Sequence, residues 1–414
     1  MNDSSLYEIT QKYGTPLYVY DGDKIVSQYK KLKSCLPDEI EIFYSMKANP
    51  LLGICQLFKE LNSCIEVASD GELYSSLEAG FLPENIIFTS PGKSYEELEY
   101  AIEHKIYSIN VECLDEACII NRIASEKNLT VDISLRINPD FEAAGSSIKM
   151  SGVPTQFGID HMLLKKVFGD ITSLSHLNII GIHVYTGTQA LDAQKILYGL
   201  EQIILLGLEL SHSYGFPLKF LDLGGGFGIP YFKGEIELDM ELLKNGLCQI
   251  WDKYKEPLAK TRVAVESGRF LLAEAGMYVT KVLYEKECKG IKFIVCDGGS
   301  NQHASSAFLG RHIRNNFPMH VLNKNDAVEE VNVVGPLCTP TDIIGQKVML
   351  PAVVPGDIIA IEKSGAYGLT QSSAAFLSHP LPAEVIQYNS SSYVLRERGR
   401  KEEFLRGQNK LLFK

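Results

Sequence analysis

The sequence predicts an α/β fold in which a (β/α)8 TIM barrel is followed by a C-terminal β domain. Over the first two-thirds of the 414 residues, eight short apolar segments alternate with helix-like stretches, and this alternation stops at about Leu272. Eight β-then-α units over about 250 residues have the number and size of a TIM barrel. An open doubly wound sheet is the alternative, but it more often has about five to seven strands.

The eight predicted barrel strands are rich in Ile, Val and Phe and nearly continuous in apolarity. Strands that are buried on both faces, as in a parallel barrel, have this composition. The predicted strands are Glu41–Met46, Cys64–Ala68, Ile86–Thr89, Tyr107–Val111, Val131–Ile137, Ile179–Val184, Phe220–Leu223 and Val263–Val265.

Helix signals lie between these strands. The segment Gly71–Gly80 ends on a glycine that suits a helix C-terminus. Ser94 followed three residues later by Glu97 forms a capping-box pattern that marks a helix start. A long helix rich in Leu and Ile is predicted within Ala190–Gly215.

After the barrel, short strands separated by Pro- and Gly-rich connections indicate a mostly β domain. The N-terminal segment Pro16–Tyr20 is expected to pair with this domain, because a terminal strand needs a partner. The charged tail 391–414 is expected to be partly frayed. The predicted bounds are 22–272 for the barrel, and 1–21 with 273–414 for the β domain. The predicted late strands are Met277–Tyr284, Phe293–Cys296, Val331–Val334, Asp357–Glu362 and Glu384–Tyr388.

Composition excludes several classes of function. Lys and Arg number 40 against 51 Asp and Glu, a net charge of −11, which disfavours general nucleic-acid binding. The sequence has no apolar run of the ~18–20 residues that cross a bilayer, and no signal-peptide core near the N-terminus. The nine cysteines include no Cys-x-x-Cys pair, so neither a disulfide framework nor a metal site is expected. Reduced cysteines are typical of the cytoplasm, and we therefore expect a cytoplasmic protein.

A lysine follows the first predicted barrel strand. Lys47 stands in Tyr-Ser-Met-Lys-Ala-Asn, and the active site of a TIM barrel lies at the C-terminal ends of its strands. Burial lowers the pKa of a lysine, and a neutral amine can bond to a carbonyl carbon. The alternative interpretation is a lysine whose ammonium group simply reaches solvent at the barrel rim.

Two loops carry a phosphate-binding pattern. Gly224, Gly225 and Gly226 follow the seventh strand, and Gly268 with Arg269 follows the eighth. Glycines let backbone N–H groups approach a phosphate, arginine adds a two-pronged contact, and these two loops are the usual phosphate site of the fold. A Gly-rich turn alone is more often only a tight turn.

A lysine, a phosphate cradle and a carboxylate at one barrel mouth point to pyridoxal 5′-phosphate. Glu266 would pair with the pyridine nitrogen and keep it protonated, which makes the ring an effective electron sink for decarboxylation. The alternative for Glu266 is a salt bridge with Arg269 or another neighbour.

Motifs along nearly the whole chain resemble those of the fold-type III pyridoxal-phosphate decarboxylases, the diaminopimelate and ornithine decarboxylase family. This resemblance implies the alanine racemase-like barrel with a β domain. The motifs are YSMKANP (44–50), IEVASDGEL (65–73), SLRINP (134–139), HVYTGTQ (183–189), LDLGGGFG (221–228), ESGR (266–269), GPLCTPTD (335–342) and SGAYG (364–368).

The resemblance implies roles for individual residues. Lys47 holds the cofactor aldehyde, Glu266 pairs with the ring nitrogen, and the glycines with Arg269 bind phosphate. Arg136 lies beneath the ring, and Tyr367 contacts the phosphate. The family's pattern also implies a homodimer with shared active sites. In it, Cys338 and Asp342 reach the partner subunit's site, and Cys338 protonates Cα after CO2 leaves.

Departures from the family pattern concern the substrate. Tyr185 stands where the family has a histidine that stacks on the cofactor ring, and an aromatic ring can still stack. Thr339 replaces an acidic residue that pairs with the substrate's distal amine. The Arg-Pro arm that grips a distal carboxylate is also missing, with Arg311 further on. Thr339, Asp342 and Arg311 are the predicted substrate residues, and free diaminopimelate, lysine and ornithine should fit poorly.

Three stretches, including 145–158, resemble a narrower subgroup. It contains the decarboxylase of an aminoglycoside (butirosin) pathway that acts on glutamate held as a thioester on an acyl carrier protein. An antibiotic pathway and a carrier-protein partner are therefore expected, with Arg311, Arg314 and Lys324 as docking candidates. The alternatives are a decarboxylase of a free amino acid, a racemase and a non-catalytic regulator. Glu266 argues against a racemase, since racemases commonly use arginine there.

Overall fold

The structure is a computed structural model of the chain, and it describes residues 1–141, 148–149, 153–307, 315–325 and 328–412. The chain forms two compact units. A barrel unit consists of Ser27–Pro230 and Ile236–Leu271. A β unit consists of Met1–Val26, Tyr231–Glu235 and Leu272–Lys414.

The barrel unit contains the predicted closed parallel barrel. Its strands follow the order β5-β4-β3-β2-β12-β11-β9-β6, and pairing of β5 with β6 closes the ring. A short strand, β8 (Ile159–Asp160), extends β6, and β7 (Ile148–Lys149) pairs with β10 (Gly187–Thr188). The barrel strands are β2 (Ile40–Ser45), β3 (Cys64–Val67), β4 (Ile86–Thr89), β5 (Ser108–Val111), β6 (Val131–Asn138), β9 (Leu177–His183), β11 (Phe220–Asp222) and β12 (Arg262–Ser267).

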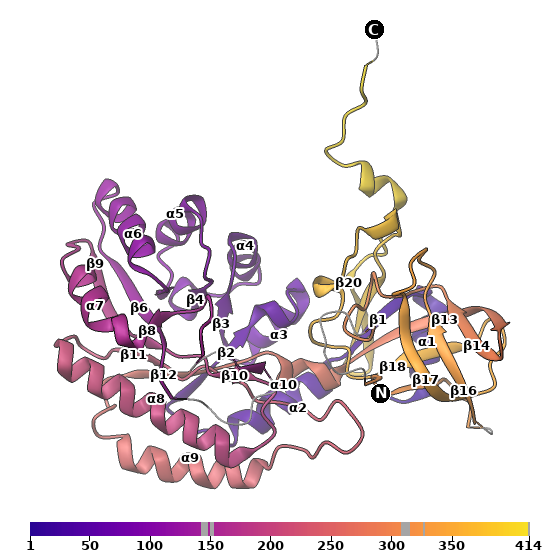
Figure 1. Cartoon of the computed structure of the whole chain (residues 1–414), viewed down its shortest axis with the longest axis horizontal. Coiled ribbons are helices and arrows are strands. Elements are labelled where there is room, and N and C mark those ends of the chain that lie inside the picture. The colour runs from indigo at the N-terminus through magenta and orange to yellow at the C-terminus, as the bar shows by residue number, and fades with distance from the viewer. Residues whose placement is uncertain (142–147, 150–152, 308–314, 326–327, 413–414) are drawn as a thin grey trace. The chain divides into compact units, whose positions relative to one another are not determined.

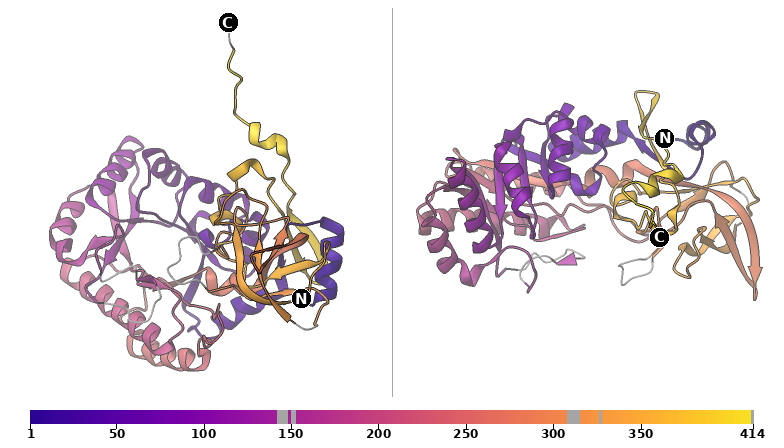
Figure 2. Two further views of the ribbon diagram at one scale, coloured as in Figure 1. Left: turned by 45° about the vertical axis from the view of Figure 1, so that its right-hand side comes forward. Right: turned by 90° about the horizontal axis from the view of Figure 1, so that it is seen from above.

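Helices surround these strands (Figures 1 and 2). The capping box at Ser94 and Glu97 is present, and the long helix predicted in 190–215 is confirmed as α8. Asp192 caps its N-terminus, and Gly215 ends it in the left-handed conformation. The helices are α2 (Gly22–Lys33), α3 (Leu52–Glu60), α4 (Asp70–Glu78), α5 (Tyr95–Glu103), α6 (Leu114–Glu126), α7 (Leu164–Thr172), α8 (Ala193–Tyr214), α9 (Met240–Tyr254) and α10 (Arg269–Leu272).

A buried apolar cluster lies among the barrel strands. Phe43 on β2, Phe220 on β11 and Ile180 on β9 belong to it, and each has a relative exposure of at most 1%. A packed interior leaves room for chemistry only at the strand ends. The polar residues at those ends therefore define where a site can form.

The β unit is a mixed sheet in the order β17-β16-β14-β13-β1-β19-β20, with β18 pairing to β13 and β15. The prediction that the N-terminal strand joins this unit is confirmed, since β1 pairs antiparallel with β13 and parallel with β19. The strands are β1 (Leu17–Asp21), β13 (Gly276–Cys288), β14 (Ile291–Cys296), β15 (Met319–Val321), β16 (Val328–Val334), β17 (Ile343–Pro351), β18 (Ile358–Ile361), β19 (Ala383–Tyr388) and β20 (Ser391–Arg396).

Four elements of the β unit, α1, β15, β17 and β20, were not predicted from the sequence. Helix α1 (Asp3–Tyr13) precedes β1, and β17 pairs with β16 through a register broken by bulges, which hides its apolar alternation. The start of the tail 391–414, which was expected to be partly frayed, forms β20, which pairs with β19. Asn389 and Ser390 both have positive φ, as in the tight two-residue turn that joins the strands of a hairpin.

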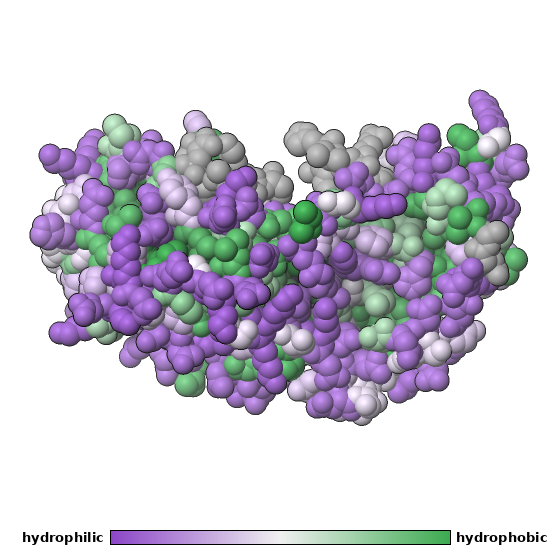
Figure 3. Space-filling view, turned by 90° about the horizontal axis from the view of Figure 1, so that it is seen from below, coloured by the Kyte–Doolittle hydropathy of each residue, from purple (hydrophilic) through white to green (hydrophobic). Residues whose placement is uncertain are grey.

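Figure 3 shows one face of the chain, on which hydrophilic side chains alternate with smaller hydrophobic areas. Within the described part of the chain, no helix is both long enough and apolar enough to cross a membrane.

Candidate active site

Lys47 lies directly after the first barrel strand. It belongs to a single 3-10 turn, Met46–Ala48, that follows β2. Its Nζ lies 2.9 and 3.0 Å from the two carboxylate oxygens of Glu66 on β3, and 5.6 Å from the ring centroid of Tyr185. The Lys47 side chain is 38% exposed, whereas that of Glu66 is 1% exposed. The side chain of this lysine is therefore only partly buried.

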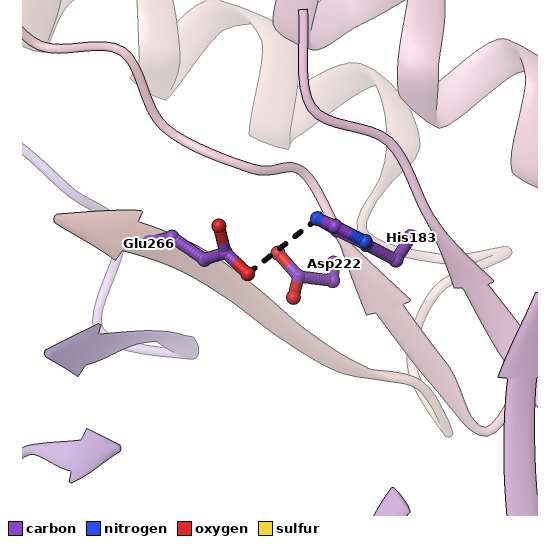
Figure 4. A group of neighbouring side chains, drawn as sticks. All are labelled: His183, Asp222 and Glu266. Atoms are coloured by element: carbon purple, nitrogen blue, oxygen red, sulfur yellow. Dashed lines mark ion pairs between the residues drawn. The ribbon is translucent and has the colours of Figure 1, made fainter. Parts of the chain in front are cut away.

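A second cluster consists of three buried titratable residues, His183, Asp222 and Glu266 (Figure 4). His183 ends β9, Asp222 ends β11, and Glu266 lies near the end of β12. Their nearest ligand atoms lie within 4.8 Å of one another, and His183 Nε2 is 3.4 Å from Glu266 Oε1. Among the residues that the structure describes, none donates a hydrogen bond to either Glu266 oxygen.

Burial controls the protonation of this cluster. Desolvation raises the pKa of Glu266 well above its usual range, and the nearby Glu66 and Asp222 carboxylates raise it further. Desolvation also raises the pKa of Asp222 to about 7 and lowers that of His183 well below its usual value. Two carboxyls and a neutral imidazole thus share one buried site.

The glycine-rich turn after β11 is tied to the neighbouring strand ends. Asp222 Oδ1 accepts a hydrogen bond from the Gly224 N–H at 2.9 Å, and the Glu266 N–H donates to the Gly224 carbonyl at 2.7 Å. Gly224 and Gly226 have φ of +64° and +99°. A Cβ on Gly225 would lie 1.9 Å from the Glu266 carbonyl oxygen. The backbone path therefore requires glycine, and it presents the turn at the barrel mouth.

The second phosphate-loop candidate is equally close-packed. A Cβ added to Gly268 would lie 2.7 Å from Ala48 Cβ and 3.0 Å from the Ser45 carbonyl oxygen. The loop after β12 is thus in contact with the turn that carries Lys47. Arg269 follows as the first residue of α10.

Arg136 on β6 is held by an ion pair. Its Nη1 donates to Glu112 Oε1 at 2.7 Å, and the guanidinium lies 4.7 Å from the centroid of the Phe157 ring. The second Glu112 oxygen accepts the Gly158 N–H at 2.8 Å. These contacts fix the guanidinium at the same end of the barrel as His183, whose pKa it helps to lower.

The remaining predicted site residues belong to the β unit. Cys338 is exposed, Thr339 is partly exposed, and both lie in the connection between β16 and β17. Asp342 is 3% exposed. Tyr367 has a φ of +56°, and its carbonyl accepts a hydrogen bond from the Ser305 hydroxyl.

Some of the predicted residues lie outside the described part of the chain. Arg311 and Arg314 both lie there, as does part of the 145–158 motif. Lys324 is described, and its Nζ donates to Asp357 Oδ2 at 2.6 Å. To contact a carrier protein, Lys324 would have to give up this ion pair with Asp357.

Sequence reasoning missed Glu66, His183 and Asp222. All three lie inside motifs that the sequence analysis had already singled out, at or near the ends of predicted strands. A search for every polar residue at a strand end would have found them. Their clustering could not be read from the sequence, because it depends on the order in which the strands pair.

The geometry fits pyridoxal phosphate. Lys47, whose side chain is partly exposed, supplies an amine that can bond to a carbonyl carbon, and glycine turns lie at the ends of β11 and β12. The buried Glu266 carboxyl has no described donor, and a protonated ring nitrogen would supply one. The barrel together with this site is typical of a pyridoxal-phosphate enzyme, and this is the class of the protein.

Comparison with known proteins identifies the family within this class. Residues 22–273 match the pyridoxal binding domain of pyridoxal-dependent decarboxylases, and the chain belongs to this family. The chain is 39% identical to the L-glutamyl-[BtrI acyl-carrier protein] decarboxylase of Niallia circulans, covering 100% of this chain and 99% of that protein. It is 32% identical to the diaminopimelate decarboxylase of Aquifex aeolicus, covering 95% and 91%.

A solved structure supports the fold assignment. The diaminopimelate decarboxylase of M. jannaschii, in complex with L-lysine, matches with a TM-score of 0.90 and 26% identity, over 98% of this chain and 94% of that one. The predicted TIM barrel with a β domain is thus confirmed. The protein is a pyridoxal phosphate-dependent decarboxylase, a carboxy-lyase.

Proposed function

We propose that the protein removes the α-carboxylate of a glutamyl group held as a thioester on an acyl carrier protein, in a biosynthetic pathway of the antibiotic type. The observation that carries this proposal is Thr339, a neutral side chain where the family places an acid. A thioester-linked chain has no distal ammonium group to pair. The 39% identity over the full chain to a decarboxylase of a carrier-bound glutamyl group supports the same substrate class.

We assign the site residues as follows. Pyridoxal phosphate, when bound, accepts the electron pair that remains when CO2 leaves. Lys47 holds the cofactor aldehyde carbon, and Glu66 accepts hydrogen bonds from its amine whenever that amine is free. Glu266 holds the ring nitrogen in its protonated form. The phosphate binds at Gly224, Gly225, Gly226, Gly268 and Arg269, together with Tyr367.

Three further residues complete the assignment. Tyr185 lies beside the Lys47 amine and offers its aromatic face to the cofactor ring. Arg136, fixed by Glu112, supplies positive charge at the same end of the barrel. Cys338 holds a proton at Sγ and delivers it to Cα, and its exposed thiol suits a residue that works at a surface.

We propose a homodimer in which each active site combines one subunit's Lys47 with the partner's Cys338. The support is that Lys47 belongs to the barrel unit and Cys338 to the β unit. Mixing Lys47→Ala chains with Cys338→Ala chains, each inactive alone, should restore about a quarter of the activity when subunits exchange randomly. Failure to recover activity after exchange has been verified by mass would contradict shared sites.

The substrate experiment compares CO2 release from four compounds under one set of conditions. Carrier-protein-bound glutamate should react at ~1–10³ s⁻¹, the usual range for an enzyme on its own substrate. Diaminopimelate and ornithine should react far more slowly, because burying their unpaired distal ammonium group costs several kcal/mol, and free glutamate should do so because its distal carboxylate would be buried unpaired in the same way. Rapid turnover of free diaminopimelate or ornithine would contradict the substrate assignment while leaving the decarboxylase class intact.

A free amino acid is the second candidate, favoured by the 32% identity to a diaminopimelate decarboxylase. Thr339→Glu separates the two. If the natural substrate is carrier-bound, this variant should lose activity toward it and gain activity toward an amine-bearing amino acid. Met349→Glu, which places the same charge on an exposed residue of β17 in the same hairpin, is the matched control, because Thr341 is hydrogen-bonded to Thr339 itself. Equal losses in both variants would point to general damage to the hairpin.

A further inference from the structure

The connection that carries Cys338 and Thr339 is built around one buried carboxylate. Strands β16 and β17 pair up to Val334 and Ile343, so residues 335–342 form the loop of a β-hairpin. Within it, the Thr339 N–H donates to the Leu337 carbonyl at 2.9 Å, and the Gly335 N–H donates to the Asp342 carbonyl at 3.2 Å. The loop is therefore folded back on itself, with Cys338 exposed at its turn.

Asp342 occupies the inside of this loop. Its Oδ2 accepts the Leu337 N–H at 2.8 Å, one residue before Cys338. Its Oδ1 accepts the Ser300 N–H at 2.7 Å, from a segment 42 residues away in sequence. With 3% of the residue exposed, both carboxylate oxygens are engaged below the surface rather than presented to a ligand.

The space around this carboxylate fits aspartate closely. A Cβ added to Gly299 would lie 2.4 Å from Asp342 Oδ1, and one added to Gly335 would lie 2.4 Å from Oδ2. Real Cβ contacts of that length are not tolerated, so both positions must remain glycine. The Asp342 carboxylate is thus packed closely against two glycines and two backbone N–H donors. A longer side chain, such as that of glutamate, would not fit in its place.

The segment that Asp342 grips leads to another predicted site residue. Ser300 begins a buried run in which the Gln302 carbonyl accepts the Tyr18 hydroxyl at 2.6 Å. Further along, the Ser305 hydroxyl donates to the Tyr367 carbonyl at 3.0 Å. One hydrogen-bonded framework inside the β unit therefore connects the Cys338 loop with the Tyr367 turn, and Asp342 is the junction.

We infer that Asp342 is a positioning residue that sets the conformation of the Cys338–Thr339 turn, and that it does not contact substrate. This role follows from the two short bonds to backbone N–H groups and from the closed packing around the carboxylate. It rests on the proposed function only in giving Cys338 a catalytic task. Charge-assisted bonds from a carboxylate to backbone donors are among the stronger ones in proteins, so their loss should change the loop locally.

The test measures the loop without using turnover. Iodoacetamide labelling followed by peptide mass spectrometry gives the alkylation rate of each exposed cysteine, and Cys113, Cys118, Cys248 and Cys288 serve as internal references. In Asp342→Asn, one acceptor oxygen is replaced by a donor that faces an N–H group. The Cys338 rate should change at least fivefold, while the reference rates stay within twofold.

Asp357→Asn is the matched control. Asp357 Oδ2 also accepts a backbone N–H, that of Val354, in a turn of the same unit that carries no predicted site residue. This variant should leave the Cys338 rate within twofold of the wild type. Hydrogen exchange adds a second measurement, because peptides that cover 299–302 and 335–342 should exchange faster in Asp342→Asn and not in Asp357→Asn.

Substrate kinetics distinguish the alternatives. A positioning role predicts that kcat falls with the altered loop, with labelling and exchange changed in the absence of substrate. An increase in KM, with Cys338 labelling and exchange at wild-type values, would overturn the inference and make Asp342 a substrate ligand. The inference would also be overturned if Asp342→Asn had the labelling rate, the hydrogen exchange and the kinetics of the wild type. If Asp342→Ala does not fold, the Asn variant still decides the question.

Discussion

Two lysine–glutamate pairs in the barrel unit differ in how deeply the lysine is buried. The Lys93 side chain is 0% exposed, and its Nζ donates to Glu116 at 2.5 Å and to the Ser90 and Asn110 carbonyls at 2.7 and 2.8 Å. Lys47 is 38% exposed and donates to Glu66. The first lysine donates all three N–H groups inside the protein, whereas the side chain of the second is partly exposed.

The surroundings of the two pairs differ in charge balance. The Glu116 carboxylate also accepts the Glu112 N–H at 2.8 Å, and Glu112 in turn binds Arg136, so this network holds two bases and two acids. Lys47 instead neighbours a region with three buried carboxyl groups, those of Glu66, Asp222 and Glu266. A balanced network is complete by itself. An excess of buried acid is stable only when protonated or when a cationic ligand enters.

The largest expected effect is that of Lys47→Ala. Without the amine, the cofactor cannot be held covalently, so the visible absorbance of the holoenzyme should disappear and turnover should fall by several orders of magnitude. Absorbance spectra and borohydride trapping followed by peptide mapping measure this directly. A Lys93→Met variant, purified in parallel, should keep both signals, and loss of the signal in that variant alone would reverse the assignment of the two lysines.

A smaller loss of turnover is expected for Glu266→Gln. The amide cannot stabilise a protonated ring nitrogen, so kcat should fall by well over tenfold, which corresponds to more than about 1.4 kcal/mol of activation free energy. Bound cofactor, quantified after acid release, should stay near one per chain. Turnover within tenfold of the wild type would show that this carboxylate does not tune the ring.

The contrast between the pairs explains what sequence could predict. Lys47 was found because it follows an apolar strand in a fold whose chemistry lies at strand ends. Lys93 gave no signal, because its partner Glu116 lies 23 residues away and only the pairing of β4 with β5 brings their segments together. Patterns local in sequence therefore identified the barrel, the glycine turns and Glu266.

Contacts distant in sequence were not predictable in the same way. The His183–Asp222–Glu266 cluster depends on β11 standing between β9 and β12. The hydrogen bonds of Asp342 depend on two connections 42 residues apart. The type of residue in a motif indicates which chemistry its side chain can perform. Which other residues bind its polar atoms depends on the order of the strands in the sheet.

For the free energy of unfolding, we expect the order of the two lysines to be reversed: removing Lys93 should cost more stability than removing Lys47, although removing Lys47 costs more activity. Removing one member of a buried ion pair leaves the other charge uncompensated, so Lys93→Met should lower the free energy of unfolding by about 3–5 kcal/mol. Denaturant titration of cofactor-free protein measures it. Lys93→Met/Glu116→Gln should recover part of that loss, since no buried charge is then left alone. A Lys47→Ala protein less stable than Lys93→Met would contradict the comparison.

The last effect is gradual: it concerns pH and the three buried carboxyl groups near Lys47, and no single pH unit changes the stability by more than about 1.4 kcal/mol. The pKa of Asp222 is raised to about 7 by burial, from an ordinary value of 3.8, so the folded cofactor-free protein binds more protons than the unfolded chain between these values. The contribution of Asp222 to the free energy of unfolding is fully present below pH 4 and is lost as the pH rises through 7. The loss is at most about 1.4 kcal/mol per pH unit. Asp222→Asn should flatten this slope when unfolding is measured from pH 4 to 7. Cofactor should flatten it as well, because a cationic ring beside Glu266 favours the ionised carboxyls. An unchanged slope in Asp222→Asn would assign the pH dependence to other groups, such as Glu72, whose pKa burial also raises to about 7.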